Sequence, residues 1–181
     1  MNLSLTLVLT ITATAAWAQT GEFVADPMPT AACHASTVVE LAGGDLMAAW
    51  FGGTAEGNPD VAIWGARRDA GQWQPPVELA REPKTPTWNP VLFHSGDGVL
   101  WLYYKFGPSP REWTGARMAS RDEGRSWSKP EHLPAGLYGP IRAKPLVLPK
   151  GLIVSGLAIA PNLAVEGLEG RFEGVSPEGM R

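Results

Sequence analysis

Residues 120–127 constrain the fold more than any other segment, because they read S-x-D-x-G-x-S-W. Asp122 can accept hydrogen bonds from nearby backbone N–H groups and so build a tight turn. Gly124 supplies the positive φ that such a turn requires. Trp127 is expected to start the next strand and to pack a large apolar ring against a neighbouring sheet. The segment therefore predicts a tight β-hairpin.

A degenerate copy of this segment lies upstream, where Trp73 aligns with Trp127 and nearby Pro and Leu residues also align. The separation of these two tryptophans is the period of the repeat. The segment 89–93 in turn resembles 144–148, so a third copy begins there. Internal similarity at this period, with short apolar runs between Gly and Pro residues, is typical of β-propeller blades of four short strands. We expect strands within 37–41, 45–51, 61–64, 91–93, 99–106 and 146–148.

The first 18 residues look like a secretory signal peptide, with a short apolar core and Ala-Trp-Ala at 16–18 as the cleavage site. A membrane anchor is the alternative, but the run is short for a span of about 20 residues. We therefore expect a secreted or periplasmic protein. The expected divisions are the signal peptide at 1–18, a leader segment at 19–32, blades at 33–160 and an atypical Gly- and Glu-rich tail at 161–181.

The composition excludes several classes of partner. The formal net charge is −3, so nucleic acids and anionic membranes are not expected as partners. Cys33 is the single cysteine, which rules out an intrachain disulfide. Zinc-ligand spacing, a P-loop and a dinucleotide fingerprint are all missing from the sequence, so we expect no metal and no cofactor.

The pattern at 120–127 is that of the Asp-box, or BNR repeat, of the sialidase superfamily, which the chain resembles. The segments 34–36 (H-A-S), 50–57 (W-F-G-G-T-A-E-G) and 60–64 (D-V-A-I-W) match sialidase-like bacterial and plant proteins of unassigned substrate. The resemblance implies an all-β, six-bladed propeller of which about two and a half blades are present. It also implies that the Asp-box lies on the face away from the active site.

A partial ring leaves sheet edges and blade faces uncovered. We therefore expect the chain to be a truncated or frame-shifted version of a longer protein. The alternative is a natural product that completes its ring by oligomerising.

The repeat points to a cluster of polar side chains near the starts of the innermost strands, where propellers bind ligands. His34, Asn89 and Lys144 occupy near-equivalent positions there. Each also has a simpler interpretation: His34 forms a local hydrogen bond, Asn89 caps a turn before Pro90, and Lys144 is solvated.

The resemblance assigns roles to two acids and to His34. Glu56 falls where sialidases place the acid/base Asp, and Asp60 is a second candidate proton donor. His34 falls where the family has its first carboxylate-binding Arg, and an imidazole cannot grip a carboxylate in the bidentate way of a guanidinium. This difference points away from sialic acid itself. Alternatively both acids are ordinary loop residues, with Asp60 paired to Arg67 or Arg68.

The loop 105–113 also recurs in the sialidase-like group. Lys105 and Arg111 are cations suited to an anionic sugar, and Trp113 could stack on a sugar face. The alternative is a solvated loop with Trp113 packed beneath it.

The resemblance implies an exo-glycosidase that hydrolyses a terminal, acidic sugar, so a carbohydrate is the expected partner. The later arginines, the nucleophilic Tyr and its partner Glu of a sialidase come from later blades, and we expect the chain alone to be inactive. The rival hypothesis is a non-catalytic glycan-binding propeller module.

Overall fold

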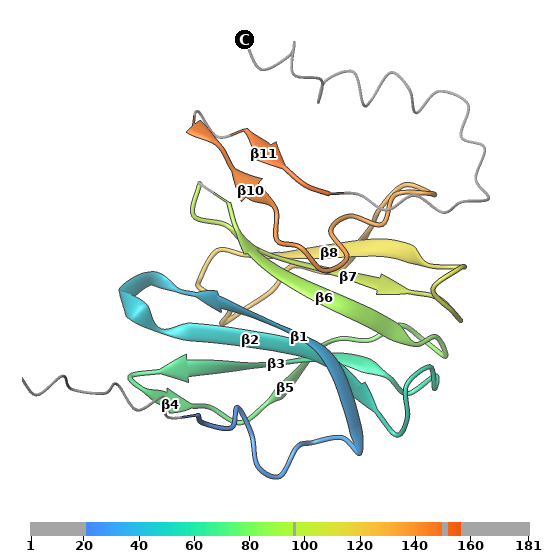
Figure 1. Cartoon of the computed structure of the whole chain (residues 1–181), viewed down its shortest axis with the longest axis horizontal. Coiled ribbons are helices and arrows are strands. Elements are labelled where there is room, and N and C mark those ends of the chain that lie inside the picture. Colours follow the sequence, from blue (N-terminus) through green and yellow to red (C-terminus); the bar gives the residue numbers. More distant parts are fainter. Residues whose placement is uncertain (1–20, 96, 150–151, 157–181) are drawn as a thin grey trace, which may run out of the picture.

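A computed structural model describes residues 21–95, 97–149 and 152–156. The chain forms two antiparallel sheets that lie face to face, followed by a small two-stranded sheet (Figure 1). The signal peptide expected at 1–18 and the tail expected at 161–181 lie outside the described residues. Within these ranges no α-helix occurs, and no helix is long and apolar enough to cross a membrane.

The first sheet has the strand order β1-β2-β3-β4, and β5 pairs with β3. The second sheet has the order β6-β7-β8-β9, and β10 pairs with β11. The first sheet comprises β1 (Ala32–Glu40), β2 (Leu46–Gly53), β3 (Ala62–Asp69), β4 (Gln72–Trp73) and β5 (Val77–Ala80), with a short 3₁₀ turn η1 (Ala42–Gly44) between β1 and β2. The later strands are β6 (Thr87–His94), β7 (Leu100–Phe106), β8 (Thr114–Ser120), β9 (Glu131–His132), β10 (Leu146–Val147) and β11 (Ile153–Val154).

The strand register confirms the repeat. His34 of β1 pairs with Phe51 of β2, and one period later Trp88 of β6 pairs with Lys105 of β7. Both inner strands also contain an irregularity just after these pairs. The two sheets are therefore consecutive blades of a propeller-type fold, and β10 and β11 begin a third.

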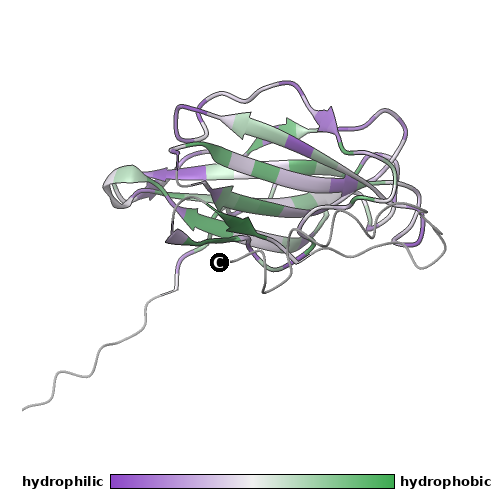
Figure 2. Cartoon of the chain, turned by 90° about the horizontal axis from the view of Figure 1, so that it is seen from above, coloured by the Kyte–Doolittle hydropathy of each residue, from purple (hydrophilic) through white to green (hydrophobic). Residues whose placement is uncertain are grey.

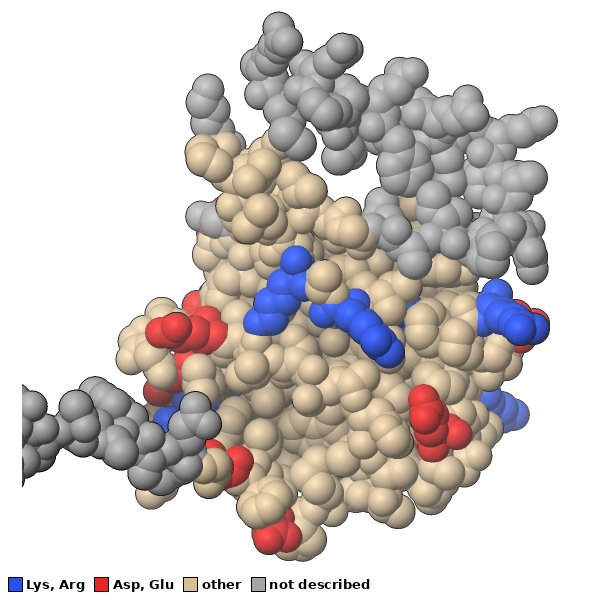
Figure 3. Space-filling model, viewed as in Figure 1, with Lys and Arg blue, Asp and Glu red and all other residues tan. Residues whose placement is uncertain are grey.

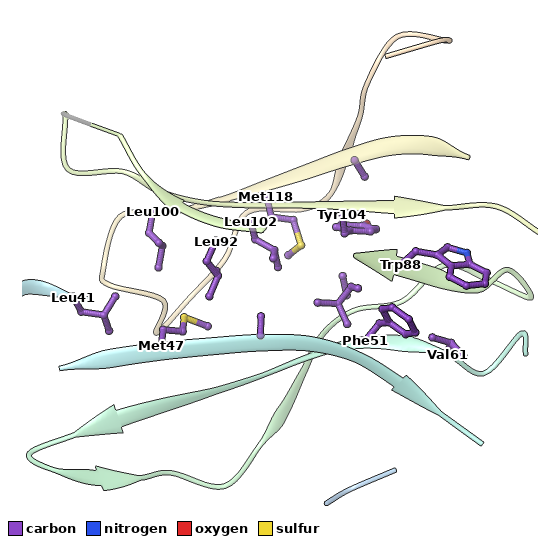
Figure 4. Packing of buried hydrophobic residues seen from close by; sticks show 14 residues of the cluster. Leu41, Met47, Phe51, Val61, Trp88, Leu92, Leu100, Leu102, Tyr104 and Met118 are labelled. Atoms are coloured by element: carbon purple, nitrogen blue, oxygen red, sulfur yellow. The ribbon is translucent and has the colours of Figure 1, made fainter. Parts of the chain in front are cut away.

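The core lies between the two blades. Side chains alternate along β2, so that Met47 and Phe51 face the second blade and Trp50 faces the opposite side. Leu102 and Tyr104 face them from β7 (Figure 4). In Figure 2 the hydrophobic stretches lie mainly in the strands and the hydrophilic ones mainly in the connecting loops. Both faces of β2 are thus buried, as expected for a strand inside a layered propeller.

The Asp-box forms the turn that its sequence predicts. The Asp122 carboxylate accepts hydrogen bonds from the Ser126 N–H at 2.8 Å and the Ser126 hydroxyl at 2.6 Å. These bonds lower the pKa of Asp122 to about 2. Gly124 has φ +80, as expected. Trp127 packs partly buried against the main core, but it does not start a strand, because β9 begins only at Glu131.

Candidate functional site

Two equivalent bulges shape one end of the blades. Ala35 in β1 and Asn89 in β6 have positive φ values of 52° and 38°, and they lie one period apart. Beside them is a cavity of about 450 Å³. It lies at the end of the sheets where β2 leads into β3, opposite to the Asp-box turn. The cavity is lined by His34, Ala35, Ser36, Thr37, Phe51, Glu56, Asn89, Pro90, Ile141 and Arg142.

His34 and Glu56 lie next to each other in the cavity lining, with His34 Nε2 4.0 Å from Glu56 Oε2. Both side chains are about half exposed, at 51% and 53%, so both are open to a ligand. A row of aromatic rings supports them. The ring centroids of His34 and Phe51 lie 5.6 Å apart, and those of Phe51 and Trp88 lie 5.7 Å apart. This packing restrains the imidazole next to the carboxylate.

Asp60 builds the loop that presents Glu56. Its carboxylate accepts hydrogen bonds from the Thr54 N–H at 2.9 Å and the Thr54 hydroxyl at 3.0 Å. The bond from the Thr54 backbone is the main reason why the pKa of Asp60 is lowered. Arg81 donates to the Asp60 carbonyl at 2.8 Å and closes the loop from outside. Asp60 does not line the cavity, and the cation that acts on its carboxylate is Arg81, which is ion-paired to Glu78, rather than Arg67 or Arg68.

Lys105 and Asn89 meet behind the cavity. Asn89 lines the cavity, while its backbone carbonyl accepts a hydrogen bond from Lys105 Nζ at 3.3 Å. Lys105 is fully buried, and burial lowers its pKa to about 7. The lysine predicted to bind substrate therefore lies beneath the cavity wall and not on its surface.

The remaining predicted residues do not line the cavity. Arg111 is exposed on the loop after β7. Trp113 packs on Trp88, with ring centroids 5.8 Å apart, and against the main core, which corresponds to the alternative stated above for this loop. Lys144 donates from Nζ to the carbonyl of Val38, and burial lowers its pKa.

Arg142, which is not among the predicted site residues, also lines the cavity. Arg142 follows Trp88 by one period, just as Trp88 follows His34. An alignment of Pro90 with Pro145 places Lys144 opposite Asn89 in the repeat, whereas the strict period places Arg142 opposite Trp88. In Figure 3 Lys and Arg side chains adjoin near the middle of the face, close to where the chain enters β10. The cavity thus combines a cation with a carboxylate, an imidazole and an amide.

Among residues 21–95, 97–149 and 152–156, no group of three or more His, Cys, Asp or Glu side chains could hold a metal ion. The charged and titratable side chains that line the cavity are Glu56, His34 and Arg142.

The blades, the Asp-box turn and the cavity at the opposite end define a sialidase-type β-propeller. Residues 44–173 match the family described as BNR repeat-like domain, and the chain belongs to this family. Among curated proteins, none matches the chain.

Two solved structures show a similar fold. The Hadza microbial sialidase Hz136 is 15% identical with a TM-score of 0.56, and the match covers 68% of this chain and 32% of that structure. A protein of unknown function from Dyadobacter fermentans DSM 18053 is 17% identical with a TM-score of 0.57, and the match covers 69% and 46%. The chain thus spans less than half of the length of either structure.

Proposed function

We propose that the cavity recognises a terminal, acidic sugar and belongs to the active site of a sialidase-like exo-glycosidase. The observation that supports this is the convergence of Glu56, His34, Asn89 and Arg142 on one cavity. Glu56 would protonate the leaving oxygen, and Arg142 would pair with the carboxylate of the sugar. The proposed partner is a carbohydrate, and the proposed location is secreted or periplasmic.

A glycan-binding module remains the second candidate, because the cavity lining favours it in one respect. Glu56 is its only carboxylate among the described residues, and the lining includes no Tyr. Tyr138, the nearest tyrosine in sequence to the cavity wall, is buried at 4% exposure. Sialidases use a Tyr nucleophile, and other glycosidases use paired carboxylates. The described part of the site therefore holds a proton donor without a nucleophile.

The test is to measure binding and hydrolysis together. Fluorogenic glycosides of N-acetylneuraminic, glucuronic and galacturonic acid, with galactose as the neutral control, are titrated and assayed with the wild-type chain, Glu56→Gln and Arg142→Gln. We expect an acidic glycoside to bind more tightly than the galactoside, and Arg142→Gln to remove that preference.

Turnover and the effect of Glu56→Gln on binding separate the two candidates. Hydrolysis that falls by about 10²–10⁴-fold in Glu56→Gln supports the exo-glycosidase. Acidic-sugar binding without turnover is expected of this chain in both cases, because the nucleophile would come from later blades. Binding that weakens in Glu56→Gln then supports the exo-glycosidase, and binding that is unchanged in Glu56→Gln supports the binding module. Equal affinity for acidic and neutral sugars, or none for either, would overturn the assignment of the cavity to acidic sugars.

A further inference from the structure

Lys105 is a fully buried lysine near the end of β7. It shares a face of that strand with Trp101 and Tyr103, because side chains alternate along a strand. This face looks away from the first blade and is covered by the segment that leads to β10. Desolvating an amine is costly unless its hydrogen bonds are replaced. The partners of Lys105 therefore explain its position.

Both partners are backbone carbonyls behind the cavity. Lys105 Nζ donates to the carbonyl of Asn89 at 3.3 Å and to the carbonyl of Pro140. Asn89 is the positive-φ residue of the β6 bulge, and Pro140 directly precedes the cavity residues Ile141 and Arg142. One amine therefore connects two walls of the cavity that are far apart in the sequence.

The first blade has no such connection at the equivalent place. Phe51 is the residue equivalent to Lys105, because Phe51 pairs with His34 in the first blade and Lys105 pairs with Trp88 in the second. Phe51 contacts Trp88 of the second blade edge to face, through apolar surfaces alone. An aromatic contact tolerates sliding, whereas hydrogen bonds fix the direction and separation of the groups they join. The second junction is therefore the more tightly oriented of the two.

We infer that Lys105 is a positioning residue, whose Nζ holds the Asn89 bulge and the segment before Arg142 at a fixed separation. Asn89 and Arg142 then face the same ligand. The amine can donate to both carbonyls whether it is protonated or neutral, so the connection persists on both sides of neutral pH. The connection itself is independent of the proposed function, and only its effect on sugar recognition rests on that proposal.

Hydrogen exchange followed by mass spectrometry tests the connection directly. Lys105→Met keeps the length of the side chain and removes the donor. We expect exchange to rise by several-fold to about tenfold in peptides covering 87–92 and 138–143, as loss of a buried hydrogen bond would produce. Peptides from β2 and β3 should be unchanged.

Tyr104→Phe is the matched control, because Tyr104 is the adjacent residue and faces the first blade. It loses a buried hydrogen bond of 2.8 Å to Glu82, which is not part of the cavity. This variant should not raise exchange selectively in 87–92 and 138–143. If Lys105→Met raises exchange evenly along the chain, Lys105 is only a core residue and the inference is wrong.

A second measurement needs no variant, in case Lys105→Met does not fold. Reductive methylation of the wild-type chain should label Lys105 far more slowly than the exposed Lys84 and Lys129. Labelling of Lys105 at their rate would show that its Nζ is free and would overturn the inference. Sugar binding distinguishes the two proposals: if the wild-type chain binds no acidic glycoside but local exchange still changes in Lys105→Met, the proposed function fails and the connection stands.

Discussion

The Asp122 carboxylate is the centre of the hydrogen bonds that form the Asp-box turn. It accepts from the N–H and hydroxyl of Ser126, and Ser120 donates its hydroxyl to the same carboxylate at 2.7 Å. The Ser120 oxygen in turn accepts from the Gly124 N–H at 2.8 Å. The three bonds to the carboxylate favour its ionised form, so the turn depends on the charge of Asp122.

We predict that this dependence appears as acid sensitivity. Because the folded-state pKa of Asp122 is about 2, against an ordinary 3.8, the unfolded chain takes up the proton first as the pH falls. The stability that Asp122 contributes is complete above its ordinary pKa and is lost between there and pH 2. Thermal unfolding followed by circular dichroism should show a steeper loss in the wild-type chain than in Asp122→Asn, which starts from a lower melting temperature at neutral pH.

Ser126→Ala provides a graded comparison, because the Ser126 side chain makes the largest contribution to the lowered pKa of Asp122. Its pH profile should lie between those of the wild type and Asp122→Asn. Identical profiles for all three proteins would mean that the carboxylate does not stabilise the turn.

The structural role of a residue could be predicted from the sequence where its hydrogen-bond partners are local, and could not where they are distant in the sequence. The roles of Asp122 and Gly124 follow from bonds within a few residues, so the sequence was sufficient. The burial of Lys105 depends on Pro140, 35 residues away, and on how the chain folds back over β7. A lysine in a Pro-rich loop gives no sign of this, which is why Lys105 looked like a ligand for an anionic sugar.

At the scale of elements, the Asp-box turn also joins the two blades. The Glu123 carboxylate accepts from the Ala42 N–H at 3.0 Å, in the turn between β1 and β2. Gly124 approaches so closely that an added Cβ would lie 2.4 Å from Met47 Sδ. The turn is therefore both a hairpin of one blade and a contact with the other.

We predict that Gly124→Ala destabilises the chain more than Gly71→Ala, a change in the β3–β4 turn of the first blade. Both glycines have similar positive φ values, +80 and +84, so both variants incur backbone strain of roughly 1 kcal/mol. An added Cβ at Gly71 meets nothing within 4 Å, whereas at Gly124 it must displace the end of the buried Met47 side chain, which adds a further cost. Urea unfolding measures both losses, and equal losses would contradict the close contact between blades.

The strands were predicted well where apolar and polar residues alternate. Their ends were predicted less well where backbone pairing with a neighbouring strand extends them. The expected strand at 61–64 continues in the structure to Asp69 as β3. Its last residues include Arg67 and Arg68, which are polar but pair with β2 and β4. Trp127 does not start a strand, because the chain beside it is joined to β8 by one backbone hydrogen bond, from the Ser128 N–H to the Ala119 carbonyl at 2.8 Å. Cross-strand pairing, which one sequence does not display, decides these boundaries.

At the scale of the whole molecule, the cavity exists only because three blades meet. His34 comes from β1, Glu56 from the loop after β2, Asn89 from β6, and Arg142 from the segment before β10. The sequence predicted the first three through the repeat and the resemblance. Predicting Arg142 as a site residue requires the exact repeat period to be extended into the third blade. There the alignment of Pro90 with Pro145 favours Lys144 instead.

Among the described residues, the third sheet also exposes apolar side chains. β10 and β11 form a two-stranded sheet, and such a sheet is marginally stable without further packing. Its strands expose Leu146 at 60% and Ile153 at 45%. Ile153 also borders an apolar cavity of about 320 Å³ that includes Phe93 and Trp101. Apolar surface gathered at one edge promotes association, unlike scattered exposed residues.

We therefore predict that the purified chain self-associates through this edge, and that the double variant Leu146→Lys/Ile153→Lys reduces the association. Light scattering over a range of concentrations gives the mean mass, and circular dichroism confirms that the variant keeps its β-structure. Val77→Lys is the matched control, since Val77 is 55% exposed but lies on β5 of the complete first sheet. A wild-type mass that stays monomeric at every concentration, or an equal effect of Val77→Lys, would show that the edge of the third sheet is not the cause.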